Sequence, residues 1–153
     1  MTGLNLVADI GNGTMNVLFI NDGRSQSGRM FTEKFGTYQC TLAVREAFLR
    51  ENQREEPDSV IENVFIGGKA NIAGQDLKLI RSVATEYVAD IFRRLREHGY
   101  DENTMTFYVT GGGGCPVRNF GKYSKSRTVF VEELCAAAKG YEFLAEAQLR
   151  AGK

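Results

Sequence analysis

The sequence contains no tryptophan, one histidine, three cysteines and two prolines among its 153 residues. A single histidine argues against the zinc and non-haem iron centres that need several imidazole ligands. This residue, His98, precedes a glycine at the expected end of a helix, so we expect it to cap that helix or to face solvent. The cysteines, Cys40, Cys115 and Cys135, form no Cys-x-x-Cys pair and are odd in number, which favours a reduced, cytosolic setting. We expect each to be a small core residue, with contact to a ligand as the alternative for Cys115.

Net charge and long apolar runs are also absent. The chain carries 19 basic and 19 acidic residues, so no overall field attracts nucleic acid or an anionic membrane. No apolar stretch approaches the roughly 18 residues of a membrane span, and nothing resembles a signal peptide. We therefore expect a cytoplasmic protein with no membrane partner and no direct contact to nucleic acid. The length fits one domain that needs neither a metal nor a disulfide for stability.

The pattern of apolar residues predicts a chain of mixed strands and helices. Strands are expected at residues 4–9, 14–21, 28–37, 106–110 and 127–130. Helices are expected at residues 40–52, 76–97 and 132–150, with a brief one at 116–120. The remaining stretch, 54–76, has an irregular pattern and is interpreted as a small insertion. Its charged start, residues 54–56, is expected to be a solvated run.

The first predicted hairpin carries a distinctive tip, Asp9-Ile10-Gly11-Asn12-Gly13-Thr14. Glycine lets the backbone approach an anion with its N–H groups turned toward it, and a carboxylate at a strand end can hold Mg²⁺. The tip therefore suits phosphate and its metal. The alternative is an ordinary hairpin turn, because Asn-Gly between apolar runs is itself a strong turn signal.

A second glycine-rich turn, Gly111-Gly112-Gly113-Gly114, follows the strand expected at residues 106–110. Four consecutive glycines offer no side chains to pack and cost conformational entropy on folding. We interpret such a run as a place where something must come close to the backbone. Together the two turns predict a cradle for a nucleotide.

The order of these elements resembles one ribonuclease-H-like half of the actin, DnaK-type chaperone and sugar kinase superfamily. Three segments carry the resemblance: VADIGNGTMNVLFINDG at 7–23, FYVTGGGGCPVRNFG at 107–121 and ELCAAAKGYEFLA at 133–145. They look most like the second half of a ParM/StbA-type actin-like protein, a family of filament-forming ATPases that segregate plasmids. The resemblance implies a ribonuclease-H-like α/β fold with a mixed five-stranded sheet flanked by helices. It also implies one domain, 1–53 plus 77–153, with 54–76 as a small inserted subdomain.

The resemblance assigns roles to the residues of the two turns. It implies that Asp9 holds Mg²⁺ with its waters and that Gly11, Asn12, Gly13 and Thr14 face the β- and γ-phosphates of ATP or GTP. It implies that Gly111, Gly112, Gly113 and Gly114 pass under the base and α-phosphate. Ribose contacts are implied for Arg50 or Gln53. Asn16 departs from the pattern, because many relatives have an acid there.

The same resemblance implies that half of the binding site is supplied from elsewhere. A complete actin-like ATPase has two facing halves, and the first half carries another phosphate turn and the residue that positions the attacking water. No catalytic residue is therefore assigned to this chain, and we expect it to be inactive alone. Its expected partners are a nucleotide, the missing N-terminal half or a partner chain, and further copies of itself.

Two other functions remain open on the sequence. The chain could be a non-catalytic interaction or self-association module that keeps the fold, since the face that the other half covers must meet solvent or another chain. It could also be a fragment of a sugar kinase or chaperone relative. A chaperone would carry a larger insertion than residues 54–76 provide, which disfavours this third possibility.

Overall fold

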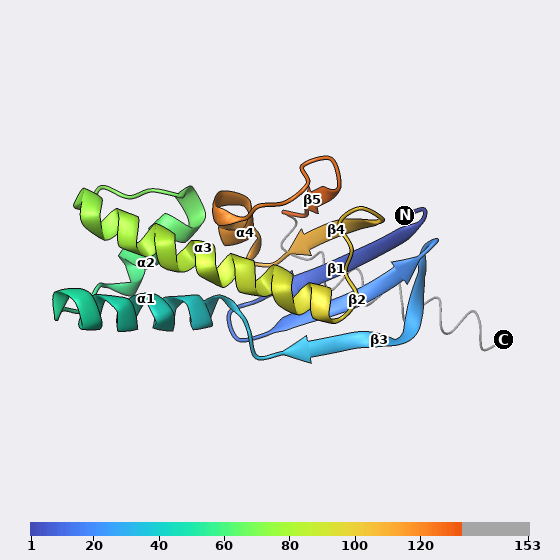
Figure 1. Ribbon diagram of the computed structural model, residues 1–153, viewed down its shortest axis with the longest axis horizontal. Helices are drawn as coiled ribbons and strands as arrows, with labels where there is room; N and C mark the ends of the chain where they lie inside the picture. Colours follow the sequence, from blue (N-terminus) through green and yellow to red (C-terminus); the bar gives the residue numbers. More distant parts are fainter. Residues whose placement is uncertain (133–153) are drawn as a thin grey trace.

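The computed structural model describes residues 1–132 (Figure 1). The helix expected over 132–150, apart from its first residue, and Cys135 lie outside the described residues. Five strands and four helices follow one another along the described part in the order β1, β2, β3, α1, α2, α3, β4, α4 and β5. None of the described helices is both long and apolar enough to cross a membrane.

The five strands form one mixed sheet in the order β3-β2-β1-β4-β5. Their bounds are Leu4–Ile10 for β1, Met15–Asn21 for β2, Arg24–Glu33 for β3, Met105–Thr110 for β4 and Thr128–Phe130 for β5. The first three strands pair antiparallel as two hairpins, whereas β4 lies parallel to both β1 and β5. The predicted mixed five-stranded sheet is therefore confirmed, with β1 at its centre.

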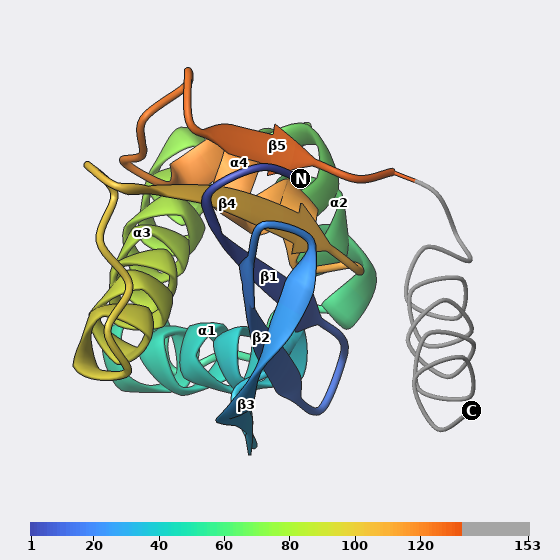
Figure 2. The same cartoon turned by 90° about the vertical axis from the view of Figure 1, so that its right-hand side faces the viewer.

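Alternation along the central strands directs one face of the sheet into the core. Leu6, Ala8 and Ile10 of β1 are fully buried, and so are Phe107 and Val109 of the neighbouring β4. Successive side chains of a strand point to opposite faces, so these residues share one face. Figures 1 and 2 show α3 running across this face, with α1 and α4 packed beside it. Burial of this face against the helices is what holds the two layers together.

Three helices cover or flank this face: α1 at Thr37–Asn52, α3 at Gly74–Glu97 and the short α4 at Gly114–Phe120. The predicted third strand extended too far, because β3 ends at Glu33 and Gly36 is already the N-cap of α1. The alternation through residues 34–37 was misleading because Phe35 is an apolar residue of the connection that packs against Tyr87 of α3.

The stretch 54–76 contains a helix, α2 at Asp58–Gly67, which sequence analysis left irregular. Its apolar side, Ile61, Val64 and Phe65, is buried. The expectation of a solvated charge run was wrong for Glu56, which is 8% exposed. Arg54 explains this burial, because its guanidinium pairs with Glu56 at 3.4 Å and also with Asp76 in the first turn of α3. A buried carboxylate is tolerated when it is paired in this way.

An ionic cluster joins the last residue of β3 to the C-terminal end of α3. Glu33 accepts a hydrogen bond from Arg94, and its other oxygen lies 3.1 Å from Nε2 of His98. His98 also stacks on Phe31, with ring centroids 3.5 Å apart, and it caps α3 as expected. Burial raises the pKa of Glu33, but the hydrogen bonds from Arg94 and His98 outweigh burial, so the pKa lies below its ordinary value.

This cluster predicts a loss of stability in acid. A carboxyl group with a lowered folded-state pKa stabilises the fold above its unfolded pKa, and the contribution disappears as pH falls through the folded value. We expect the free energy of unfolding to fall as pH drops below about 4.5, the ordinary pKa of Glu33. The Glu33→Gln variant should be less stable at neutral pH and should lose less on acidification. Urea unfolding at several pH values measures this, and parallel curves for the two proteins would contradict it.

Candidate functional site

The parallel pairing of β1 with β4 brings the two glycine-rich turns to the same edge of the sheet. Asp9 lies opposite Thr110 in this pairing, so both turns begin at adjacent strand ends. The amide of Gly113 donates a 2.9 Å hydrogen bond to the carbonyl of Ile10, which joins the turns directly. Open α/β sheets commonly bind ligands just outside the carboxyl ends of neighbouring parallel strands.

The first turn is held by the start of α1. Within the tip, the amide of Gly11 donates to the carbonyl of Thr14 at 2.9 Å. The first amides of α1, on Thr37 and Tyr38, donate to the carbonyls of Gly11 and Asn12, both at 2.9 Å. These contacts hold the carbonyls of the turn on the side facing α1.

Gly36 allows this close approach, although sequence analysis gave it no role. A Cβ atom at Gly36 would lie 2.3 Å from the carbonyl oxygen of Asn12. In the part of the chain that the structure describes, the amides of Asn12, Gly13 and Thr14 donate to no protein acceptor. The turn therefore presents free N–H groups from a fixed backbone, which is the arrangement that binds anions.

Two of the four glycines in the second turn are required by packing within the chain. Gly111 has φ +82°, and a Cβ there would lie 2.5 Å from the carbonyl oxygen of Ile10. A Cβ on Gly113 would lie 2.2 Å from Cγ2 of Ile10. The prediction that something comes close to the backbone of this run is therefore confirmed at two positions, where the approaching group is β1 itself. Gly112, by contrast, would meet nothing within 4 Å.

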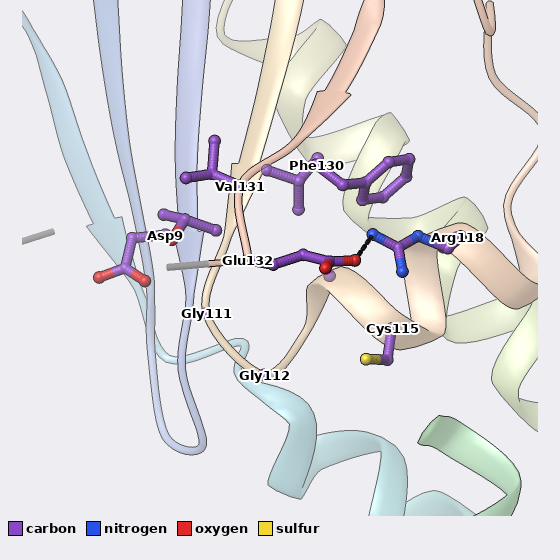
Figure 3. Close-up of a pocket in the computed structure, with 11 residues that line it drawn as sticks. Asp9, Gly111, Gly112, Cys115, Arg118, Phe130, Val131 and Glu132 are labelled. Carbon is purple, nitrogen blue, oxygen red and sulfur yellow. Dashed lines mark ion pairs between the residues drawn. The ribbon is translucent and has the colours of Figure 1, made fainter. Parts of the chain in front are cut away.

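A cavity of about 410 Å³ opens beside the second turn (Figure 3). It is lined by Asp9, Val109, Thr110, Gly111, Gly112, Gly114, Cys115, Arg118, Phe130, Val131 and Glu132. Four residues of the sequence prediction are in this lining: Asp9, Gly111, Gly112 and Gly114. The hairpin residues Gly11, Asn12, Gly13 and Thr14 and the packed Gly113 are not. The hairpin tip therefore lies outside the pocket lining, although it is at the same edge of the sheet.

Three prominent side chains of this pocket have no signal in the sequence. Arg118 on α4 forms an ion pair with Glu132, with 2.7 Å between Nη2 and Oε1. The same guanidinium lies 4.7 Å from the ring centroid of Phe130 on β5. Only folding places α4 beside the end of β5, so the spacing of these residues in the sequence gave no signal.

The cysteines behave differently from one another. Cys40 is fully buried in α1, and burial raises the pKa of its thiol to about 12. Cys115 is half-buried and lines the pocket, so the alternative of a ligand contact fits it better than a core position. Arg50 and Gln53, the expected ribose contacts, are not among the lining residues.

The pocket can hold a divalent cation only together with a ligand. The side chain of Asp9 makes no ion pair within residues 1–132, and its Oδ1 lies 2.8 Å from the position of a Cβ on Gly111. In the same residues no group of three or more histidine, cysteine or acidic side chains is placed to hold a metal. Mg²⁺ is commonly bound by one or two carboxylates, waters and substrate phosphates, so Asp9 fits a phosphate-borne ion. Asn16, opposite Asp9 on β2, is engaged with the hydroxyl of Thr32 at 2.7 Å.

Comparison with known proteins shows that this fold is similar to that of solved actin-like structures. Ta0583, an archaeal actin homolog, superposes with a TM-score of 0.72 at 17% identity over 96% of this chain. ParM of Bacillus thuringiensis with ATP gives 0.61 at 13% identity over 88% of the chain. The Alp12 filament structure gives 0.64 at 14% identity over 86% of the chain. The predicted actin-like, ribonuclease-H-like fold is thereby confirmed.

The chain spans only part of these structures. It covers 49% of Ta0583, 42% of the ParM chain and 43% of the Alp12 chain. No protein-family model and no curated protein sequence matches it. At these identities the likeness extends to the fold, and function must be argued from the site.

Proposed function

We propose that this chain binds a purine nucleoside triphosphate with Mg²⁺ between its two glycine-rich turns. The observation that carries the proposal is the hydrogen bond between Gly113 and Ile10, which fixes both turns at one sheet edge. The free amides of the first turn would face phosphate oxygens, and the carboxylate of Asp9 would hold the metal through water. The open backbone at Gly112 leaves room for the nucleotide beside it.

The chain would act as one half of an actin-like filament-forming protein of the plasmid-segregation type. Its coverage of about half of each compared structure supports this, as does the fact that one of them is a filament. The other half, on the same polypeptide or on a partner chain, would close the opposite side of the nucleotide. Residues 54–76 would be the small inserted subdomain of this half. Filaments of this type would form in the cytoplasm.

A second candidate, a non-catalytic self-association module, is favoured by exposed apolar side chains on α1. Tyr38, Leu42 and Leu49 are 42%, 39% and 50% exposed, and their spacing places them along one stripe of the helix. Such a stripe can serve as a contact for another protein surface. Sedimentation with and without ATP separates the candidates, because polymers that need nucleotide favour the first and a dimer indifferent to nucleotide favours the second.

Nucleotide binding is tested by changing the pocket without disturbing the fold. Asp9→Ala should weaken Mg-ATP binding because it removes the metal ligand, and Gly112→Val should weaken it because the new side chain fills the pocket. Losing a charged contact of this kind costs about 1.5–3 kcal/mol, or roughly ten- to hundredfold in Kd. Calorimetric titration of the purified chain and its variants measures the effect.

Matched controls are available elsewhere on the chain. Gly67→Val adds the same side chain at the end of α2, where a Cβ meets nothing within 4 Å. Asp90→Ala removes an exposed carboxylate from α3 that, within residues 1–132, pairs only with Arg93. Both should bind as the wild type does. Equal affinity in all five proteins, or no binding by any, would refute the proposed function.

A further inference from the structure

Arg118 and Glu132 form a polar pair at one end of the pocket, and this pair has unused hydrogen-bonding capacity. Glu132 is exposed, with 75% of its side chain accessible, and Arg118 is 42% accessible. Figure 3 shows the Glu132 carboxylate reaching across the pocket toward Arg118, on the side away from Asp9. An arginine has five N–H donors and a carboxylate accepts at both oxygens, so among residues 1–132 this one ion pair leaves most of these sites free.

This end of the pocket is poorly suited to phosphate. The positive charge of Arg118 is already balanced by Glu132 at 2.7 Å, and the carboxylate itself repels an anion. The nearby Val109, Phe130 and Val131 are apolar and suit the flat face of an aromatic ring. A nucleotide whose phosphates lie at the turns and Asp9 would thus place its base here.

The pair presents hydrogen-bonding groups in a fixed sequence. Along the pair run two acceptors, the Glu132 oxygens, followed by a donor, an N–H of Arg118. Guanine carries the complementary series on one edge: the donors N2–H and N1–H, followed by the acceptor O6. Adenine offers only one donor beside one acceptor on either of its hydrogen-bonding edges. Guanine can therefore make one more charge-assisted hydrogen bond than adenine.

We propose that the Arg118–Glu132 pair recognises the edge of the purine base and makes this pocket prefer guanine nucleotides over adenine nucleotides. This inference rests on the proposed function, since it assigns the base end of the same pocket. Glu132 selects by accepting from the two adjacent donors of guanine, and Arg118 holds the carboxylate in position while donating to O6. Because the pair is open to solvent, we expect a preference of about tenfold rather than the far larger ratios of enclosed sites.

The test compares Mg-GTP, Mg-ITP and Mg-ATP by NMR titration of the isotopically labelled full chain, which detects millimolar affinities. Inosine lacks the 2-amino donor of guanine, so ITP should bind more weakly than GTP. The Glu132→Gln variant should lose the preference for GTP, because its affinity for GTP falls more than its affinity for ATP. Glu62→Gln, an exposed position on α2 outside the pocket, is the matched control. Unchanged thermal unfolding of Glu132→Gln verifies that it is folded.

The possible results separate the two proposals. A tenfold preference for GTP that disappears in Glu132→Gln supports the inference. Equal binding of all three nucleotides, a preference for ATP, or a GTP preference that survives Glu132→Gln overturns it and leaves the proposed function standing. Shift changes for none of the nucleotides, including at the Gly111–Gly114 amides, overturn both.

Discussion

Gly113→Ala should destabilise the fold by roughly 1–3 kcal/mol, the usual cost of overpacking a close contact. The added Cβ would lie 2.2 Å and 2.5 Å from two side-chain carbons of Ile10, and 3.2 Å from its carbonyl oxygen. Ile10 is fully buried at the end of β1 and cannot move away. Gly113 has φ −70° and ψ −10°, which alanine adopts readily, so the effect reports the clash alone. Thermal unfolding measures it, at roughly 2–4 °C per kcal/mol for a chain of this size.

Gly112→Ala is the matched control for this experiment. The residue is the preceding one in the same run, yet its Cβ would meet nothing within 4 Å. We expect its melting temperature to be unchanged or slightly raised, because alanine restricts the unfolded chain. Equal losses of stability at the two positions would show that the run is sensitive as a whole, and would contradict the contact with Ile10.

The second large effect concerns hydrolysis. We expect the isolated 153-residue chain to hydrolyse ATP or GTP far more slowly than the roughly one turnover per second at the low end for kinases. In-line attack requires a positioned water and charge stabilisation from several directions. The pocket can contact a triphosphate from one side, and Asp9 is its single acidic group near the turns.

Phosphate release from the purified chain measures this rate. Asp9→Ala serves as the control for contaminating activity, since a background enzyme would be indifferent to that substitution. A rate near one per second that depends on Asp9 would show that a single half carries a complete catalytic site.

The sequence predicted the strands because the alternation in β1, β2 and β4 is regular, and the resemblance to the actin-like superfamily implied that they form one mixed sheet. Strand ends were less certain where local pattern and packing disagree. Phe35 continued the alternation of β3, although it packs on Tyr87 of α3 outside the strand. The helix α2 was missed because its pattern of burial depends on contacts with α3 and α4.

The candidate site was partly predictable for a similar reason. Asp9 and the glycine run carry their signal locally, in a strand end followed by residues without side chains. Arg118 and Glu132 meet only because the chain after α4 returns through β5 beside that helix. Their separation in the sequence therefore does not indicate the pair. Gly36 has no local signature either, since its role comes from the carbonyl of Asn12, 24 residues earlier in the chain.

The bonds from the first amides of α1 to Gly11 and Asn12 couple distant parts of the molecule. A helix of 16 residues behaves as a rigid rod, and its far end at Asn52 adjoins the connection to α2. A shift of the hairpin tip would therefore be expected to move α1 and, with it, the surface around α2. Conversely, a neighbouring molecule that presses on that surface would change the position of the tip. Ligand binding at the sheet edge and contact with a neighbour near α2 would then influence each other.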